Sequence, residues 1–191
     1  MIQVIRQYPC NIGEIVKKAS ENGETKLATA GKGVMFNVPK FYQECTKYNI
    51  VPIIGCEFPL DNGRTISLFA KDNEGYKNLI AISYEVSKNP LTMDFLRNHS
   101  DGLGLILDIS TCKLTELVSK EDIRKYLAEY QRLFSLFKLG LPYGESYKEL
   151  ISKIKEFVKD FPYDLVAFPH MLYEKSEDAI VLEIVNAISN A

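Results

Sequence analysis

The chain has 191 residues, of which 46% are hydrophobic and 25% are charged. That composition supplies the core of one sizeable domain, and the length is too short for two large ones. The formal net charge is −2, so the composition gives no electrostatic basis for nucleic-acid binding by this chain alone. A chain that is mainly disordered is also excluded.

The cysteines and histidines are few and dispersed. Cys10, Cys45, Cys56 and Cys112 include no C-x-x-C pair, and only two histidines accompany them, which argues against a structural zinc site and a disulfide scaffold. No apolar run approaches the roughly 18 residues of a membrane span, and the amino terminus lacks the pattern of a secretory signal. We therefore expect a cytoplasmic protein with reduced thiols and no membrane contact.

Strand-like and helix-like segments alternate along the chain. In the first half, the expected strands are residues 2–5, 26–30, 50–58 and 65–70, and the expected helices are residues 12–22, 38–48, 71–86 and 92–98. Asn11 with Glu14 resembles a capping box, and Asn37 is the expected N-cap of the second helix. Glycines at positions 31 and 33 indicate a turn, and Asn62-Gly63 predicts a tight hairpin.

The second half continues the alternation. The expected strands are residues 103–107, 132–139 and 164–168, and the expected helices are residues 114–130, with a break near Ser119, 147–161 and 176–189. Helical spacing predicts an inward stripe of Tyr76, Leu79, Ile80 and Ser83 in the helix at 71–86. The same spacing gives the helix at 147–161 the apolar stripe Tyr147, Leu150, Ile151, Ile154, Phe157, Val158 and Phe161.

This rhythm predicts an α/β fold with about six parallel strands and one antiparallel hairpin partner. An eight-unit barrel typically needs about 250 residues, so a smaller, irregular barrel similar to a TIM barrel fits the length better. The alternative is an open, doubly wound sheet. No change of composition marks an internal boundary, so residues 1–191 are expected to form a single domain.

The residues alone do not assemble a catalytic centre. Ala30-Gly-Lys-Gly33 fails the phosphate-loop pattern at both test positions, because Lys26 and Gly33 stand where Gly and Ser or Thr are required. His99 lies in a polar loop and is read as a turn residue, whereas His170 follows a predicted strand, where active residues of barrels often lie. Glu57 is the best carboxylate candidate, and Cys56 is read as a buried structural thiol.

A long segment of the chain resembles a known family. Residues 33–57 read Gly-Val-Met-Phe-Asn-Val-Pro-Lys-Phe-Tyr-Gln-Glu-Cys-Thr-Lys-Tyr-Asn-Ile-Val-Pro-Ile-Ile-Gly-Cys-Glu. They resemble the PHP (polymerase and histidinol phosphatase) domain at the amino terminus of bacterial DNA polymerase III alpha subunits, where a Thr-Asp-His-Gly turn, a helix with Phe-Tyr and Ile-Lys-Pro-Ile-Ile-Gly-Cys-Glu follow one another. Residues 68–79, 139–142 and 165–167, followed by Tyr173 and residues 176–178, agree in the same order.

The resemblance implies that most of the family's metal ligands are replaced. The opening His-x-His of the family falls on Gln3 and Ile5, and the Asp-His of its turn falls on Gly31 and Lys32. The family's glutamate is kept as Glu57. The Ser-Gly-Cys element falls near Asp108 and Ile109, and the last Asp-x-His falls on His170 and Leu172. Aliphatic side chains cannot ligate a metal, and Lys32 adds a positive charge where the family binds divalent cations. We therefore expect no catalytic residue, metal or cofactor in this domain; the alternative is a single weak metal site at Glu57 and His170.

The resemblance further implies the family's seven-stranded β/α barrel, here as the amino-terminal part of a much longer polymerase. Its expected partners are the palm and thumb of the same chain, with DNA and other replisome subunits met through the parent polymerase. Magnesium would serve nucleotidyl transfer in the polymerase domain, outside these residues. Two alternatives are a free-standing PHP phosphoesterase that uses metal ions, and an unrelated barrel or doubly wound binding module.

Overall fold

The structure, a computed structural model, describes residues 3–5, 11–117, 119–161 and 163–168. Its strands are β1 (Gln3–Ile5), β2 (Lys26–Lys32), β3 (Val51–Pro59), β4 (Thr65–Ala70), β5 (Leu103–Asp108), β6 (Leu136–Leu141) and β7 (Leu165–Ala167). Its helices are α1 (Ile12–Glu21), α2 (Val38–Lys47), α3 (Asn73–Val86), α4 (Met93–Asn98), α5 (Lys120–Leu133) and α6 (Lys148–Asp160), with 3-10 turns at Lys113–Thr115 and Glu145–Tyr147.

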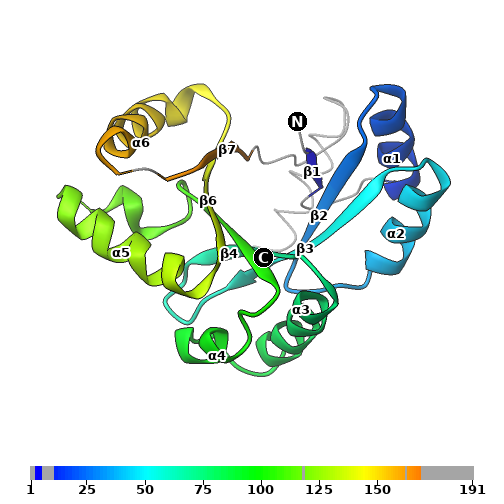
Figure 1. The fold of residues 1–191 in the computed structure, drawn as a ribbon, viewed down its shortest axis with the longest axis horizontal. Coiled ribbons are helices and arrows are strands. Elements are labelled where there is room, and N and C mark those ends of the chain that lie inside the picture. The colour runs from blue at the N-terminus through cyan, green and yellow to red at the C-terminus, as the bar shows by residue number, and fades with distance from the viewer. Residues whose placement is uncertain (1–2, 6–10, 118, 162, 169–191) are drawn as a thin grey trace, which may run out of the picture.

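The strands form one sheet in chain order, from β1 to β7. The strand β4 is antiparallel to both β3 and β5, and every other neighbouring pair is parallel. Figure 1 shows the sheet curved into an arc with the helices on its outer side. A doubly wound sheet would reverse its strand order, so that alternative is wrong. Within the described residues, strand pairing runs from β1 to β7 without a bond between these two edge strands. Closure of the sheet into a full barrel remains a prediction.

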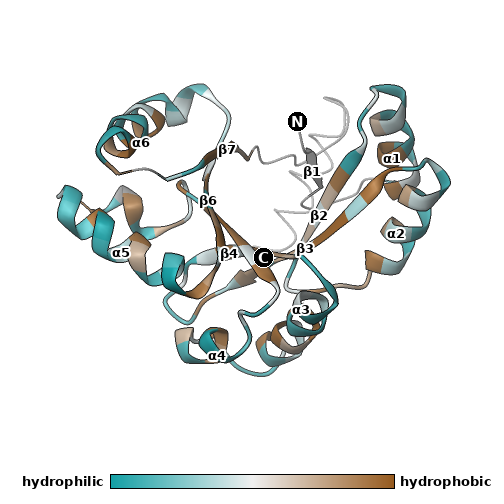
Figure 2. Ribbon diagram, in the orientation of Figure 1, coloured by the Kyte–Doolittle hydropathy of each residue, from teal (hydrophilic) through white to brown (hydrophobic). Residues whose placement is uncertain are grey.

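The main hydrophobic core lies on the convex face of the sheet, beneath the helices. Cys56 and Phe58 of β3 pack there with Leu79 of α3, Leu127 of α5 and Ile154 of α6, each less than 1% exposed. A smaller cluster joins α1, α2 and β2. In Figure 2 hydrophobic residues concentrate in the strands, while the surrounding helices alternate between hydrophobic and hydrophilic stretches. Burial of one stripe of each helix therefore holds the helices on the sheet.

The concave face has its own, smaller apolar cluster. Ala28, Ala30, Phe69 and Phe168 are buried there, and the rings of Phe69 and Phe168 meet edge-on with centroids 6.4 Å apart. A mostly apolar cavity of about 190 Å³ adjoins them. The middle of the concave face is thus apolar, as in packed barrel interiors, which leaves the carboxyl ends of the strands for polar side chains.

Several local predictions are confirmed. Asn11 caps α1 by accepting a hydrogen bond from the Gly13 N–H at 3.1 Å. The antiparallel pairing of β3 with β4 confirms the hairpin. Its turn is longer than the tight one predicted, because the pairing stops at Pro59 and Thr65, and Gly63 but not Asn62 has a positive φ. Ser119 caps α5 by accepting from the Asp122 N–H at 3.0 Å, so the expected break lies at that residue. The helix expected from residue 114 is replaced before this break by a 3-10 turn at Lys113–Thr115. The predicted helix at 176–189 lies outside the described residues.

Other local predictions need correction. Gly31 lies within β2 rather than in a turn, because the strand continues to Lys32 before Gly33 adopts a positive φ of 67°. Asn37 precedes α2 but makes no capping bond with its side chain. The helix α5 continues to Leu133, so the following strand begins four residues later than expected, at Leu136.

The predicted inward stripe of α3 is also wrong in part. The buried residues of this helix are Gly75, Leu79 and Ile82, whereas Tyr76 and Ile80 are exposed. The cause is the close packing of Gly75 against the backbone of Gly102, which turns the glycine side of the helix toward the sheet.

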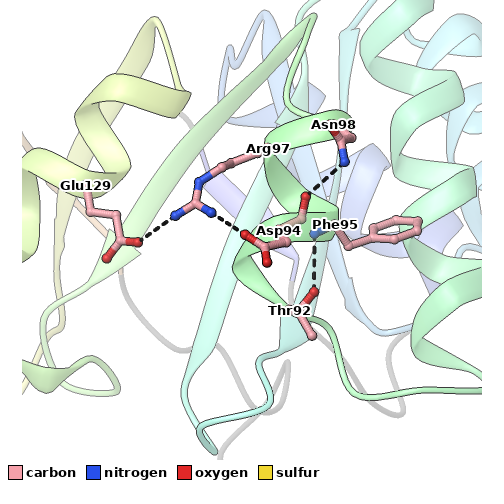
Figure 3. A network of polar contacts seen from close by, with 6 residues as sticks. All are labelled: Thr92, Asp94, Phe95, Arg97, Asn98 and Glu129. Atoms are coloured by element: carbon pink, nitrogen blue, oxygen red, sulfur yellow. Dashed lines mark hydrogen bonds and ion pairs between the residues drawn. The ribbon is translucent and has the colours of Figure 1, made fainter.

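The short helix α4 is tied to α5 by polar contacts at the surface (Figure 3). The Thr92 hydroxyl accepts from the Phe95 N–H at 3.2 Å, and Arg97 pairs with Asp94 and reaches Glu129 at 3.4 Å. Exposed ion pairs contribute at most about 1 kcal/mol, so the fully buried Leu96 does more to hold α4 in place.

His99 occupies the C-cap position of α4. Its Nδ1 lies 2.9 Å from the Phe95 carbonyl oxygen, and its ring stacks on that of Phe95. It is therefore a helix-end residue, although half-buried rather than fully solvated.

No helix in the described part of the chain is both long and apolar enough to cross a bilayer.

We predict opposite effects of two alanine substitutions in the first turns of helices. A Cβ at Gly75 would overlap the carbonyl of Gly102, whereas a Cβ at Gly13 would meet side-chain atoms at 3.4 Å and beyond. Gly75→Ala should lower the free energy of unfolding by about 1–3 kcal/mol, and Gly13→Ala should leave it unchanged or raise it by up to about 1 kcal/mol. Urea denaturation measures both, and equal effects would contradict the close packing of α3.

Candidate functional site

Polar side chains gather on the concave face where the strands end. Cys56 and Phe58 belong to the convex core, so Glu57 between them points to the concave side, because side chains alternate along a strand. Lys32 is the register partner of Glu57 on β2, and Ser67 is its partner on β4. Residues paired in register share a face of the sheet, so both lie beside Glu57.

Asp108 joins the same face from β5. Its neighbours Leu107 and Ile109 are both buried in the convex core, which places the carboxylate on the concave side. Asp108 Oδ1 accepts hydrogen bonds from the Ser110 N–H at 2.8 Å and the Ser110 hydroxyl at 2.6 Å. These bonds form a local turn that fixes one oxygen of the carboxylate.

The four residues Lys32, Glu57, Ser67 and Asp108, here called the strand-end cluster, differ in exposure. Glu57 is 5% exposed, Asp108 is 2% exposed and Ser67 is 1% exposed, whereas Lys32 is open to solvent. Ser67 was not predicted from the sequence. The signal for it was a polar residue between the apolar Ile66 and Leu68 in the middle of a predicted strand.

The end of β2 is fastened to β3 by two hydrogen bonds. The Gly33 N–H donates to the Glu57 carbonyl at 2.7 Å, and the Cys56 thiol donates to the Gly31 carbonyl at 2.9 Å. Gly33 suits its position because a positive φ carries little strain in glycine. The bonds hold the backbone of Lys32 beside that of Glu57.

The thiol of Cys56 has a structural rather than a nucleophilic environment, as predicted. It is fully buried, and burial raises its pKa to about 12. A nucleophilic cysteine needs the opposite shift, toward a stable thiolate.

The other positions implied by the family resemblance are only partly described. The backbones of Gln3 and Ile5 pair in β1 with those of Leu27 and Thr29. Ile109 is buried in the convex core, so it does not face the strand-end cluster. His170 and Leu172 lie outside the described residues.

The donor atoms of the described residues do not fit a multinuclear metal centre. Within that part of the chain, no group of three or more His, Cys, Asp or Glu side chains could hold a metal ion. One oxygen of Asp108 is engaged by Ser110, and the cationic Lys32 lies in register with Glu57. A divalent cation requires several anionic or neutral donors at one point, and a neighbouring ammonium opposes it.

Comparison with known proteins agrees with this architecture. Over residues 9–161 the chain matches the sequence profile of the PHP domain. The chain therefore belongs to the PHP domain family. Its match covers the strand-end cluster and helices α1 to α6.

Its curated relatives within that family include DNA polymerase III alpha subunits. The chain is 34% identical over 152 residues to the subunit of Chlamydia trachomatis, a match that covers 65% of this chain and 12% of that protein. It is 24% identical over 195 residues to the subunit of Halalkalibacterium halodurans, covering 94% of this chain and 17% of that protein. The chain thus spans less than a fifth of the length of these relatives.

A solved structure shares the fold. A candidate metal-dependent phosphoesterase from Bifidobacterium adolescentis superposes with a TM-score of 0.59 at 10% identity, covering 97% of this chain and 96% of its own. At this identity the likeness concerns the fold alone.

We predict that the three described cysteines are unreactive in the folded protein. Burial raises the pKa of Cys56 and Cys112 to about 12 and that of Cys45 to about 11. At pH 8 roughly one in ten thousand thiols with a pKa of about 12 is a thiolate, against about a quarter for an unfolded cysteine. Iodoacetamide should therefore label these residues at least about a hundredfold more slowly in the folded chain than in urea.

Peptide mapping after timed labelling distinguishes the three sites. Because the folded state keeps these thiols protonated, their contribution to stability is complete below the unfolded pKa near 8.5 and declines as the pH rises above it. Labelling of Cys56 at the same rate in folded and unfolded chains would contradict its burial.

Proposed function

We propose that this chain is the amino-terminal PHP domain of a DNA polymerase III alpha subunit and that it serves the polymerase as a structural domain. Its curated relatives carry that name. In this proposal residues 1–191 form one domain and a closed seven-stranded barrel. The domain itself carries no metal-dependent phosphoesterase or proofreading activity.

The observation that supports the proposed loss of activity is the pairing of Lys32 with Glu57 in neighbouring strands. Glu57 is the one family ligand position within the described residues that keeps its carboxylate. An ammonium group on the neighbouring strand, on the same face, repels a divalent cation there. Ile5 and Leu172 add no ligand atoms, so two of the positions that could compensate for this repulsion supply no donor.

The remaining features of the proposal concern the parent protein. The polymerase would transfer nucleotides with magnesium in a later domain, contact DNA through that domain and operate in the cytoplasm within the replisome. The PHP domain would pack against the palm and thumb of the same chain. Its net charge of −2 suits a domain that does not hold DNA by itself.

A second candidate function is a metal-dependent phosphoesterase. The name of the Bifidobacterium neighbour and the retained Glu57 favour it, with His170 as a second ligand for a single metal ion. Two ligands next to a lysine would bind such an ion weakly.

An assay with labelled single-stranded DNA separates the two functions. We expect the purified chain to release no nucleotide in Mn²⁺ or Zn²⁺, and Glu57→Ala to behave like the parent sequence. Glu145→Ala, which removes an exposed carboxylate, is the matched control. Metal-dependent release that is lost in Glu57→Ala and kept in Glu145→Ala would favour the phosphoesterase.

Sequencing the gene beyond the codon for Ala191 tests whether this chain is part of a polymerase. We expect the coding sequence to continue beyond Ala191 into a polymerase region with clustered aspartates. The full-length product should extend a primed template with magnesium. A gene that stops near Ala191 would contradict the proposal.

A further inference from the structure

A groove between α3 and the segment that follows β2 exposes an unusual amount of apolar surface. Phe36 is 87% exposed, Tyr84 62% and Ile80 48%, and Val34 and Tyr76 are also exposed. All five line one groove of about 640 Å³. Contiguous exposed apolar surface of this kind marks interaction sites rather than chance exposure. We call these five residues the α3 groove.

The α3 groove has a fixed floor. The Ser83 hydroxyl donates to the Gly33 carbonyl at 2.8 Å, which ties the residue after β2 to the last turn of α3. Met35 packs against the convex core below. Since Gly33 is also bonded to Glu57 of β3, the segment is held at both sides, and the groove is formed before any partner binds.

The helix α3 is apolar on two sides. Leu79 and Ile82 face the core and are fully buried, whereas Tyr76, Ile80 and Tyr84 repeat every four residues on a second side that lines the groove. A surface helix needs only one apolar stripe to pack on its own sheet. The second stripe therefore indicates a second packing partner.

The size of the groove favours a partner that is covalently attached. Ten residues line it, whereas stable interfaces between separate proteins involve about 20–30 residues on each side. A tethered segment has an effective concentration in the millimolar range, so a small surface suffices. The Chlamydia relative has 88% of its length outside the matched segment, which supplies ample chain for this purpose.

We propose that the α3 groove docks an apolar segment from a later domain of the same polymerase chain, one that presents leucine or aromatic side chains to Phe36, Ile80 and Tyr84. This inference rests on the proposed function and adds the surface through which the structural role is exerted.

Photo-crosslinking in the full-length polymerase subunit tests this docking. One variant carries p-benzoylphenylalanine in place of Phe36. The matched control carries it in place of Tyr143, which is 88% exposed and lies outside the groove. We expect the Phe36 variant to form cross-links within one molecule, to residues beyond 191. The yield should exceed that of the control by about tenfold and should not depend on protein concentration.

Other outcomes overturn the inference. Cross-links between two molecules, with a yield that rises with concentration, would identify a second copy as the occupant. A yield at position 36 no higher than at position 143 would mean that the groove stays open. If the subunit extends primed DNA in either result, only the docking surface is wrong and the proposed function stands.

An independent measurement uses a substitution in the groove itself. Ile80→Asp should speed amide hydrogen exchange in α3 and in the docked segment of the full-length subunit by about tenfold or more, because a buried charge excludes the segment. Tyr143→Asp should leave both unchanged. Faster exchange confined to α3 would count against docking.

Discussion

The pairing of β2 with β3 is the constraint on which the remaining features depend. Seven register pairs run from Lys26 and Val51 to Lys32 and Glu57, and the Gly33 N–H and the Cys56 thiol add two bonds at the far end. The register puts a lysine beside the candidate carboxylate, and the bond at Gly33 directs the following segment against α3. A shift by one residue would move every side chain to the opposite face. The same pairing therefore determines the strand-end cluster and the α3 groove.

This arrangement separates the fold from its chemistry. The convex core consists of apolar side chains beneath the helices, and the middle of the concave face is filled by residues such as Phe69 and Phe168. Neither depends on a metal ion for its packing. Side chains at strand ends can therefore change with little effect on the barrel-like sheet, which is why conservation of a fold does not preserve its activity. Under the proposed function, Lys32 is such a change.

Much of the fold was predictable because periodicity and caps act locally. Ser119 marked the break that precedes α5, Asn11 marked the start of α1, and the buried pattern of residues 50–58 predicted β3. The position of Glu57 on the concave face followed from strand alternation once its neighbours were known to be in the core. The pairing of Lys32 with Glu57 was not predictable from spacing, because the extent of β2 past Gly31 depends on bonds to β3. Glycine there indicated a turn, and tertiary hydrogen bonds overrode that local preference.

The helix α3 shows why apolar periodicity alone cannot distinguish a core from an interface. Both Gly75–Leu79–Ile82 and Tyr76–Ile80–Tyr84 follow helical spacing, and the second series contains more apolar surface. The first faces the sheet because Gly75 has no side chain and lets the helix approach the backbone of Gly102. A rule that counts large apolar residues gives glycine no weight and therefore selects the exposed side. Since close approach buries more of Leu79 and Ile82, the bulkier stripe is left facing outward, where it is available to a partner.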